Sequence, residues 1–298
     1  MPRKPRIHVP GGFYHVILRG NARQNIFFSA RDRQFWESLL ETALARHDHR
    51  LHAYCWMTNH VHMAVQGGTE PLAKFMSFLA SNYARTCNRQ RLRSGHLFER
   101  RYQAILVQQN NYLLELVRYI HLNPVRANMV ETPSDYQWSS HNAYLGINCP
   151  NWLTVTTVLN MFATRIGEAR RRYASFMHDK PPCSMLDLLR RGNESNDQVL
   201  GDDHWLEIIE RKLDNQRIGR HTKTSLDDLI RQACDTHSTT EYELAGPSRK
   251  RALARIRAQI ALDATEQGIA SISEVARRLG RTQPTLSRAT QKLRSKQK

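Results

Sequence analysis

The chain has 298 residues, which is enough for a sizeable hydrophobic core and predicts two domains. Its 44 Lys and Arg against 27 Asp and Glu give a net charge of +17, which favours a polyanionic partner such as nucleic acid over a membrane surface. No apolar run of about 18 residues and no signal peptide is visible, and the five scattered cysteines lack Cys-x-x-Cys spacing. These features argue against a disulfide framework and a zinc finger and favour a reducing cytoplasm.

Residues 1–148 are predicted to form an α+β domain. Apolar patterns typical of strands occur at 13–19, 51–57, 61–66 and 102–107. Apolar residues at helical spacing predict helices at 32–46, 72–88 and 110–122. Because the strands and helices interleave over short links, an antiparallel sheet covered by helices is expected.

Residues 149–223 are predicted to be a helical connector and linker. One helix is expected around Glu168–Tyr173, and Pro181-Pro182 breaks the chain. The polar stretch 190–203 is typical of a solvated linker.

Residues 224–298 are predicted to form an all-α domain that ends in a helix-turn-helix. Residues 248–298 contain 13 Lys and Arg and 3 Asp and Glu, a local net charge of +10. Helices are expected at 273–279 and 283–293, with Gly280 in the turn between them. The residues expected to contact DNA are Arg249, Lys250, Arg251, Arg281, Gln283, Thr285, Arg288 and Lys292. A solvated helical bundle with a charged face is the alternative.

Two histidines stand two residues apart in Asn59-His60-Val61-His62, within an apolar run typical of a strand. Side chains at this spacing point to the same face, so His60 and His62 can present two imidazoles to one metal ion while Val61 turns into the core. Ordinary polar histidines are the commoner explanation of such a pair, so it gains weight only with a second motif.

The second motif is Leu116–Pro124 (LVRYIHLNP), which is typical of the end of a helix. Tyr119 and Asn123 are four residues apart and can therefore share a helix face, which places a phenol beside an amide oxygen. Together with the histidines, this motif predicts a divalent-metal site with its own tyrosine nucleophile. The alternatives are a packing tyrosine and a helix stop formed by Asn before Pro.

A rival nucleophile and a choice of metal remain open. Tyr112 lies seven residues before Tyr119 on roughly the same helix face, but only Tyr119 stands four residues from Asn123. Tyr112 and Tyr102 are expected to be core or base-stacking residues. Two imidazoles and an amide oxygen without a thiolate suit Mg²⁺ or Mn²⁺, and Zn²⁺ would also fit the nitrogens.

Three stretches within residues 5–145 resemble the one-tyrosine HUH transposases of single-stranded DNA, and among them the REP-associated tyrosine transposases. They are Tyr54–His62 (YCWMTNHVH), Leu97–Tyr102 (LFERRY) and Tyr112–Ala127 (YLLELVRYIHLNPVRA). The helix motif with its Asn-Pro end is highly specific, and the His-hydrophobic-His pattern is moderately so.

The resemblance implies a ferredoxin-like fold with both histidines on a central strand. It implies His60 and His62 as metal ligands, Asn123 as the third ligand and Tyr119 as the nucleophile. Many family members carry Gln at the third-ligand position, and Asn is one methylene shorter, so its reach depends on how the helix lies. Arg118 and Arg126 of the same motif are expected to contact DNA.

The activity implied is a metal-dependent single-strand endonuclease and transposase. It would nick and rejoin DNA at hairpin-forming repeats through a covalent phosphotyrosine, without ATP. The metal's field, a water or a basic neighbour such as Arg118 would help the phenol to lose its proton. The alternatives are an origin-nicking replication protein of the same chemistry and a non-catalytic DNA-binding regulator, which would not need an intact site. A bacterial, nucleoid-associated location is expected.

Residues 224–298 resemble the DNA-binding domain of the bacterial replication initiator DnaA at Pro247–Arg251, Ala258–Ala261 and Ile272–Ala289. Where the initiator reads DNA with Asp-His-Thr-Thr, this chain has Thr282–Thr285 (TQPT), so the initiator's sequence specificity is not expected. Duplex DNA is the expected partner of this domain. The chain has no Gly-rich Lys-Ser/Thr phosphate loop, which excludes an ATP-driven initiator.

Overall fold

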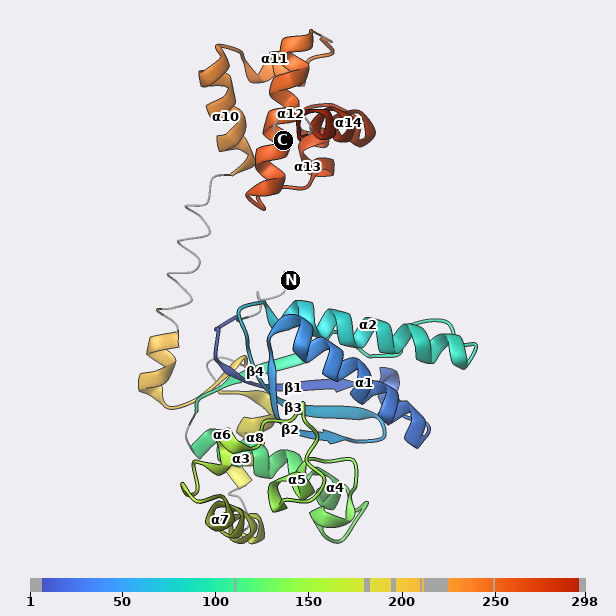
Figure 1. Cartoon of the computed structure of the whole chain (residues 1–298), viewed down its shortest axis with the longest axis vertical. Coiled ribbons are helices and arrows are strands. Elements are labelled where there is room, and N and C mark those ends of the chain that lie inside the picture. Colours follow the sequence, from blue (N-terminus) through green and yellow to red (C-terminus); the bar gives the residue numbers. More distant parts are fainter. Residues whose placement is uncertain are drawn as a thin grey trace. The chain divides into compact units, whose positions relative to one another are not determined.

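The computed structural model describes residues 7–109, 111–179, 183–193, 197–209, 211, 225–248 and 250–294. The chain divides into two compact units, Met1–Ile209 and Glu210–Lys298, which are considered separately (Figure 1). Within the described ranges, no helix is both long and apolar enough to cross a membrane.

A five-stranded sheet forms the centre of the first unit, with the strand order β2-β3-β1-β4-β5. The strands are β1 (Phe13–Arg19), β2 (Arg50–Trp56), β3 (His60–Gln66), β4 (Gln103–Val107) and β5 (Val199–Leu200). The first four pair antiparallel, as predicted, but β5 pairs parallel with β4. The α+β prediction is confirmed. The expectation of a purely antiparallel sheet is wrong, because the chain returns to the sheet after the helices on one face and adds β5 as a short parallel edge strand.

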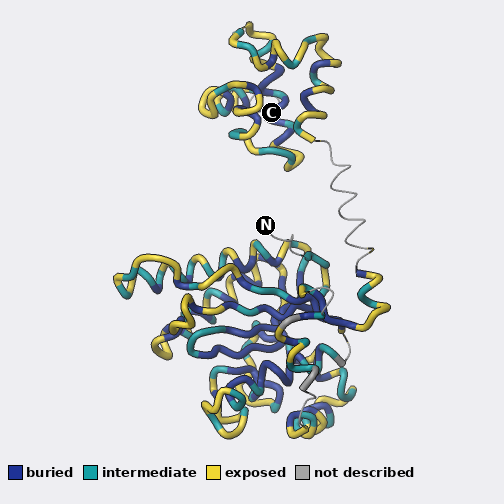
Figure 2. Tube along the Cα trace, turned by 180° about the vertical axis from the view of Figure 1, so that it is seen from behind, coloured by how far each residue is buried: buried dark blue, intermediate teal, exposed yellow. Residues whose placement is uncertain are grey.

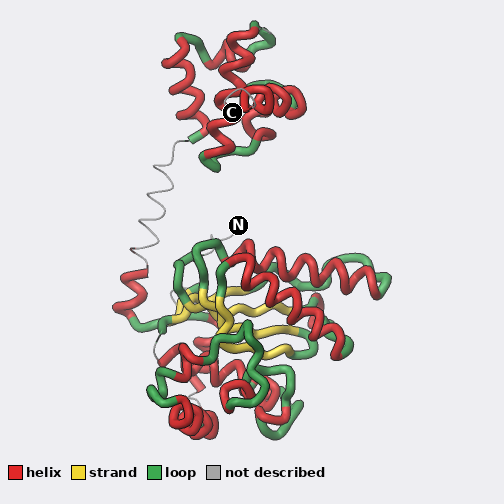
Figure 3. The backbone as a smooth tube through the Cα atoms, in the orientation of Figure 1, coloured by secondary structure: helices red, strands yellow, loops and turns green. Residues whose placement is uncertain are grey.

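Helices cover both faces of this sheet (Figures 1 and 3). One face carries α1 (Ala30–His47) and α2 (Leu72–Gln90), and Trp36 of α1 packs edge-on against Trp56 of β2. The other face carries α3 (Asn111–His121) and the helices that follow it, so the strands are buried between two layers (Figure 2). The later helices are α4 (Asn123–Arg126), α5 (His141–Leu145), α6 (Thr156–Leu159), α7 (Ile166–His178) and α8 (Cys183–Arg191), and short 3-10 turns occur at η1 (Asn21–Arg23) and η2 (Pro133–Asp135).

The segment after residue 148 packs on the first unit as far as residue 209. Leu189 of α8 is 1% exposed, and Val199 and Leu200 of β5 are also buried. The structure therefore has one boundary at residue 209, where the sequence suggested boundaries at 148 and 223. Pro181-Pro182 lies outside the described residues.

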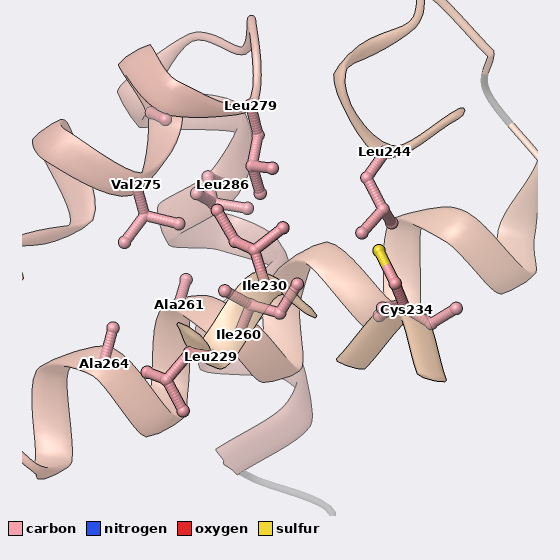
Figure 4. Packing of buried hydrophobic residues seen from close by; sticks show 12 residues of the cluster. Leu229, Ile230, Cys234, Leu244, Ile260, Ala261, Ala264, Val275, Leu279 and Leu286 are labelled. Atoms are coloured by element: carbon pink, nitrogen blue, oxygen red, sulfur yellow. The ribbon is translucent and has the colours of Figure 1, made fainter. Parts of the chain in front are cut away.

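The second unit consists of helices around a small apolar core (Figure 4). They are α10 (Leu226–His237), α11 (Glu241–Ala245), α12 (Arg251–Glu266), α13 (Ile272–Arg278) and α14 (Gln283–Arg294). Leu279 and Leu286 bring the last two helices into this core. Gly280 has φ +60° in the turn between them, a conformation that glycine adopts without strain. Both helices lie where the sequence predicts them.

Candidate active site

The two histidines of β3 lie on the sheet face that carries α3. His60 and His62 have ring centroids 4.9 Å apart, and Val61 between them is fully buried on the opposite face. Their cross-strand partners on β1 are Arg19, opposite His60, and Ile17, opposite His62. The alternation expected of the strand is therefore what brings the two imidazoles together.

Both imidazoles are held neutral and each has one ring nitrogen in a hydrogen bond. Burial lowers the pKa of His60 to about 4, with a smaller effect of Arg19, and burial lowers the pKa of His62 well below its usual value. His60 Nδ1 lies 2.6 Å from the amide oxygen of Asn59, whose amide nitrogen donates to the carbonyl of Arg23. His60 Nδ1 therefore donates, which leaves its Nε2 lone pair unprotonated. A neutral imidazole with one free lone pair is the form that binds a metal.

Tyr119 of α3 lies against the same histidines. Its ring packs edge-on against those of His62 and His15, with centroid distances of 5.6 and 5.4 Å, and its side chain is 3% exposed. Asn123 donates from its amide nitrogen to the Tyr119 carbonyl at 3.1 Å, which leaves the amide oxygen free to act as an acceptor. The tyrosine helix α3 ends at His121, directly before Asn123-Pro124, as the sequence predicts. Asn123 then begins the short helix α4, where Pro is tolerated in the first turn.

These side chains line a cavity of about 640 Å³ that is rich in arginine. Its lining includes His60, His62, Tyr119 and Asn123 but not Tyr112. Six arginines also line it, alongside Glu99 as the one acidic residue among the described lining: Arg19, Arg23, Arg100, Arg101, Arg126 and Arg190. Such a charge balance suits a phosphodiester.

Arg126 is the arginine most closely associated with the tyrosine. Its guanidinium lies 4.1 Å from the centre of the Tyr119 ring, and Nη2 donates to the Tyr119 carbonyl at 2.8 Å. Its Nη1 is buried and has no hydrogen-bond partner within the described part of the chain. A buried, unsatisfied donor at the edge of a cavity is a candidate contact for a ligand oxygen.

Arg118 does not reach this cavity, which corrects its expected contact with DNA. It is 4% exposed, and it forms an ion pair with Glu115 at 2.6 Å. Its Nη1 donates to the carbonyl groups of Phe176 and Asp179 at 3.0 and 3.1 Å. Neighbouring helical residues point about 100° apart, so Arg118 faces α7 while Tyr119 faces the sheet.

The side chains of His60 and His62 fit a hard divalent ion if the amide oxygen of Asn123 is a third ligand. Over the described ranges, no group of three or more His, Cys, Asp or Glu side chains could hold a metal ion. A third protein ligand beside His60 and His62 would therefore be the oxygen of Asn123, with water in the remaining positions. Nitrogen and neutral oxygen donors without thiolate are compatible with Mg²⁺ or Mn²⁺.

A family model for transposases matches the part of the chain that carries most of these side chains. Residues 9–123 match the family model described as "Transposase IS200 like". This part of the chain is similar to the IS200-like transposases. The match ends at Asn123, so the transposase family model covers both histidines and the tyrosine and ends before Arg126.

Three solved structures are similar to parts of this chain. A REP-associated tyrosine transposase bound to a REP hairpin is 16% identical, with TM-score 0.44 over 52% of this chain and 92% of that one. A protein of Deinococcus radiodurans R1, provisionally assigned as a transposase, is 16% identical, with TM-score 0.30 over 43% and 98%. The tRNA(His) guanylyltransferase of Saccharomyces cerevisiae is 10% identical, with TM-score 0.32 over 61% and 86%. Comparison with curated proteins gives no match.

Several side chains at the candidate site were not expected from the sequence. Arg19 of β1 and Arg190 of α8 line the cavity, and His15 of β1 contacts His62 and Tyr119. The alternation of β1 could have placed His15 and Arg19 on one face. Only the pairing of β1 with β3, however, shows that this is the face of the two histidines.

The residues expected to contact DNA in the second unit lie mostly at its surface. Lys250 and Arg251 are exposed at the start of α12, and Gln283, Thr285, Arg288 and Lys292 are exposed on α14. Arg281 is half-buried and donates to the carbonyls of Gly246 and Ser248, so it holds the loop before α12. Arg249 lies outside the described residues.

Proposed function

We propose that this protein is a metal-dependent single-strand DNA endonuclease and transposase that nicks and rejoins DNA through a covalent bond to Tyr119. The observation that carries the proposal is the convergence of two neutral imidazoles, one tyrosine and an unsatisfied arginine in one cavity. The similarity of residues 9–123 to IS200-like transposases supports DNA cleavage in general.

In the proposed reaction, the phenol oxygen of Tyr119 attacks a backbone phosphorus atom and the phenol gives up its proton. A new oxygen–phosphorus bond forms while the bond to the leaving sugar oxygen breaks, and that oxygen takes up a proton. Reversing the same exchange with another strand end rejoins the DNA. The energy of the phosphodiester is kept in the phosphotyrosine, so no nucleotide is needed.

The site residues divide this work between them. His60, His62 and Asn123 would hold the metal, and the bound ion would polarise the phosphate and neutralise its charge. Arg126 would donate from its free Nη1 to a non-bridging phosphate oxygen, and the other arginines of the cavity would bind the flanking backbone. Hairpin-forming repeats are the proposed substrates because the helix motif resembles that of the REP-associated enzymes.

The second unit is proposed to bind duplex DNA. The turn at Gly280 joins α13 to α14, and α14 presents polar and basic side chains away from the core. Gln, Thr, Arg and Lys are the types that contact base edges and phosphates. A helix-turn-helix with α14 in the major groove is the arrangement that this exposure supports.

The test is a nicking reaction with purified protein, a hairpin-bearing single strand and Mn²⁺. The expected products are a shortened strand and a protein–DNA adduct that survives denaturation. EDTA and the variant Tyr119→Phe should each abolish both products, while Tyr112→Phe should nick like the wild type. Tight DNA binding with no cleavage under any metal would instead support a non-catalytic regulator.

A further inference from the structure

His15 is a completely buried histidine in the middle of β1, next to the proposed metal site. Its Nε2 lies 2.9 Å from Nδ1 of His62, and its Nδ1 lies 2.8 Å from the backbone carbonyl oxygen of Leu189 in α8. The rings of His15 and His62 are stacked with centroids 5.2 Å apart. Both nitrogens of His15 are therefore in hydrogen bonds.

These two contacts determine where the protons must be. A carbonyl oxygen only accepts hydrogen bonds, so Nδ1 of His15 carries the hydrogen that it donates to Leu189. His15 is completely buried, and burial favours the neutral form of an imidazole. A neutral imidazole has one hydrogen, so Nε2 of His15 is the acceptor, and Nδ1 of His62 is the donor that it faces.

The proton arrangement leaves Nε2 of His62 with a bare lone pair. If His62 had the opposite tautomer, its Nδ1 and Nε2 of His15 would meet as two lone pairs at 2.9 Å. Nε2 of His62 would then carry hydrogen and could not bind a metal. Ligating histidines in general use the second nitrogen to fix the tautomer and the ring orientation.

We propose that His15 is a positioning residue that fixes the tautomer of His62. Because the Leu189 carbonyl accepts from Nδ1 of His15, Nε2 of His15 accepts from Nδ1 of His62, and Nε2 of His62 is left unprotonated to bind the metal. This inference rests on the proposed function of the histidine pair as metal ligands. His15 is not itself a ligand in this arrangement, since no group of three His, Cys, Asp or Glu side chains within the described ranges could hold a metal.

The anchor of this chain of hydrogen bonds lies outside the residues that match the transposase family. Leu189 belongs to α8, whose position beside the sheet is supported by a hydrogen bond from Gln103 to the carbonyl of Arg190 at 3.2 Å. The tautomer of His62 is thus fixed through a residue that follows the matched residues 9–123.

The first test measures the tautomer directly in the metal-free protein. Long-range ¹H–¹⁵N spectra of ¹⁵N-histidine-labelled protein distinguish a protonated Nδ1 from a protonated Nε2, and His62→Gln assigns the signal. The expected result is hydrogen on Nδ1 in both His15 and His62. Hydrogen on Nε2 of His62 would overturn the proposal.

The second test measures Mn²⁺ affinity by titration calorimetry. His15→Leu removes the acceptor and should weaken binding on the order of 10- to 100-fold, the usual effect of removing a ligand's hydrogen-bond partner. His15→Gln retains an acceptor and should restore most of the affinity. The matched control is His52→Leu: His52 is equally buried and also bonds to a carbonyl, that of Thr154 at 2.9 Å, but its second ring nitrogen faces Gln66 and not a proposed metal ligand.

The outcomes separate this inference from the proposed function. Wild-type Mn²⁺ affinity in folded His15→Leu would overturn the role of His15 and leave the metal site intact. Wild-type affinity in His62→Ala would instead refute the metal site itself. If His15→Leu fails to fold, the tautomer spectra and His15→Gln still decide the matter, since a tautomer that is mixed in the wild type contradicts the proposal.

Discussion

The candidate site contains two neutral imidazoles, the phenol of Tyr119, and Arg126, whose Nη1 has no hydrogen-bond partner among the described residues. Each of these properties comes from burial or from a neighbour on another strand or helix. Burial lowers the pKa of His60 and His62, and the stacking of Arg126 on Tyr119 keeps a positive charge beside the phenol. Single substitutions should therefore have separable effects.

Substitution of a histidine ligand should have a larger effect than substitution of the amide ligand. We expect His60→Ala or His62→Ala to reduce Mn²⁺-dependent nicking at least 100-fold, because the ion loses a strong nitrogen donor. Asn123→Ala should reduce it about 10-fold or less, since water can replace one neutral oxygen ligand. His237→Ala, at an exposed position in the second unit, is the control. Robust nicking by the wild-type protein in excess EDTA would rule out a metal at this site.

The two arginines beside the tyrosine motif should behave in opposite ways. Arg126→Ala should lower the nicking rate about 100-fold with a small change in stability, because a phosphate donor is lost. Arg118→Ala should lower the free energy of unfolding by about 3 kcal/mol, because it leaves Glu115 without its buried partner. Nicking rates and urea denaturation curves of both variants distinguish these effects. Equal loss of activity without destabilisation in Arg118→Ala would restore its expected DNA contact.

Among the elements, α3, α5 and α7 are joined by a buried network of histidine and tyrosine side chains. The Tyr173 hydroxyl lies 2.7 Å from Nδ1 of both His121 and His141, and Nε2 of His121 lies 2.6 Å from the Ser140 hydroxyl. Burial lowers the pKa of His141 to about 4 and lowers that of His121 well below its usual value. The network fixes α3, and with it Tyr119, on the rest of the first unit.

This network makes stability depend on pH. The folded-state pKa of each histidine lies below the unfolded value of about 6.5, so the unfolded chain binds more protons between pH 4 and 6.5. The contribution of these histidines to the free energy of unfolding should therefore be constant above pH 6.5 and fall below it, by about 1.4 kcal/mol per pH unit for each such histidine. Urea denaturation at pH 7 and pH 5 measures the fall, and His141→Asn should reduce it. A stability that is unchanged from pH 7 to pH 5 would contradict buried neutral histidines.

The sequence was most informative where an interaction is local. The alternation of β3 predicts that His60 and His62 share a face, and helical spacing predicts the proximity of Tyr119 and Asn123. Helix phase also accounts for the error over Arg118, whose side chain is turned about 100° away from that of Tyr119 on α3. The contact of Arg126 with Tyr119 depends on how the separate helix α4 follows α3. His15 and Leu189 could not be predicted in this way, because their contacts depend on the pairing of β1 with β3 and on a helix 174 residues further along the chain.

For the whole molecule, two compact units predict separable functions. A protein that ends at residue 220 should still nick single-stranded hairpins, because the histidines, tyrosine and arginines of the cavity lie before that point. It should lose much of its duplex affinity, because residues 248–298 carry +10 of the net charge of +17.

Salt dependence provides the readout for this truncation. Each phosphate contact made by the second unit should add roughly 0.9 to the log–log slope of affinity against salt. Duplex binding of the full-length and shortened proteins at two salt concentrations measures this slope. If the shortened protein binds duplex as tightly as the full chain, the second unit does not bind DNA in the proposed way.

The central claim is that Tyr119 becomes covalently attached to DNA, and peptide mapping of the adduct tests it most directly. Wild-type protein is incubated with a hairpin-bearing single strand and Mn²⁺, the adduct is digested with protease and nuclease, and the modified peptide is sequenced by mass spectrometry. The proposal predicts a nucleotide phosphate on Tyr119 and no adduct in Tyr119→Phe. A nucleotide on Tyr112 or another side chain, or cleavage without any adduct, would contradict it.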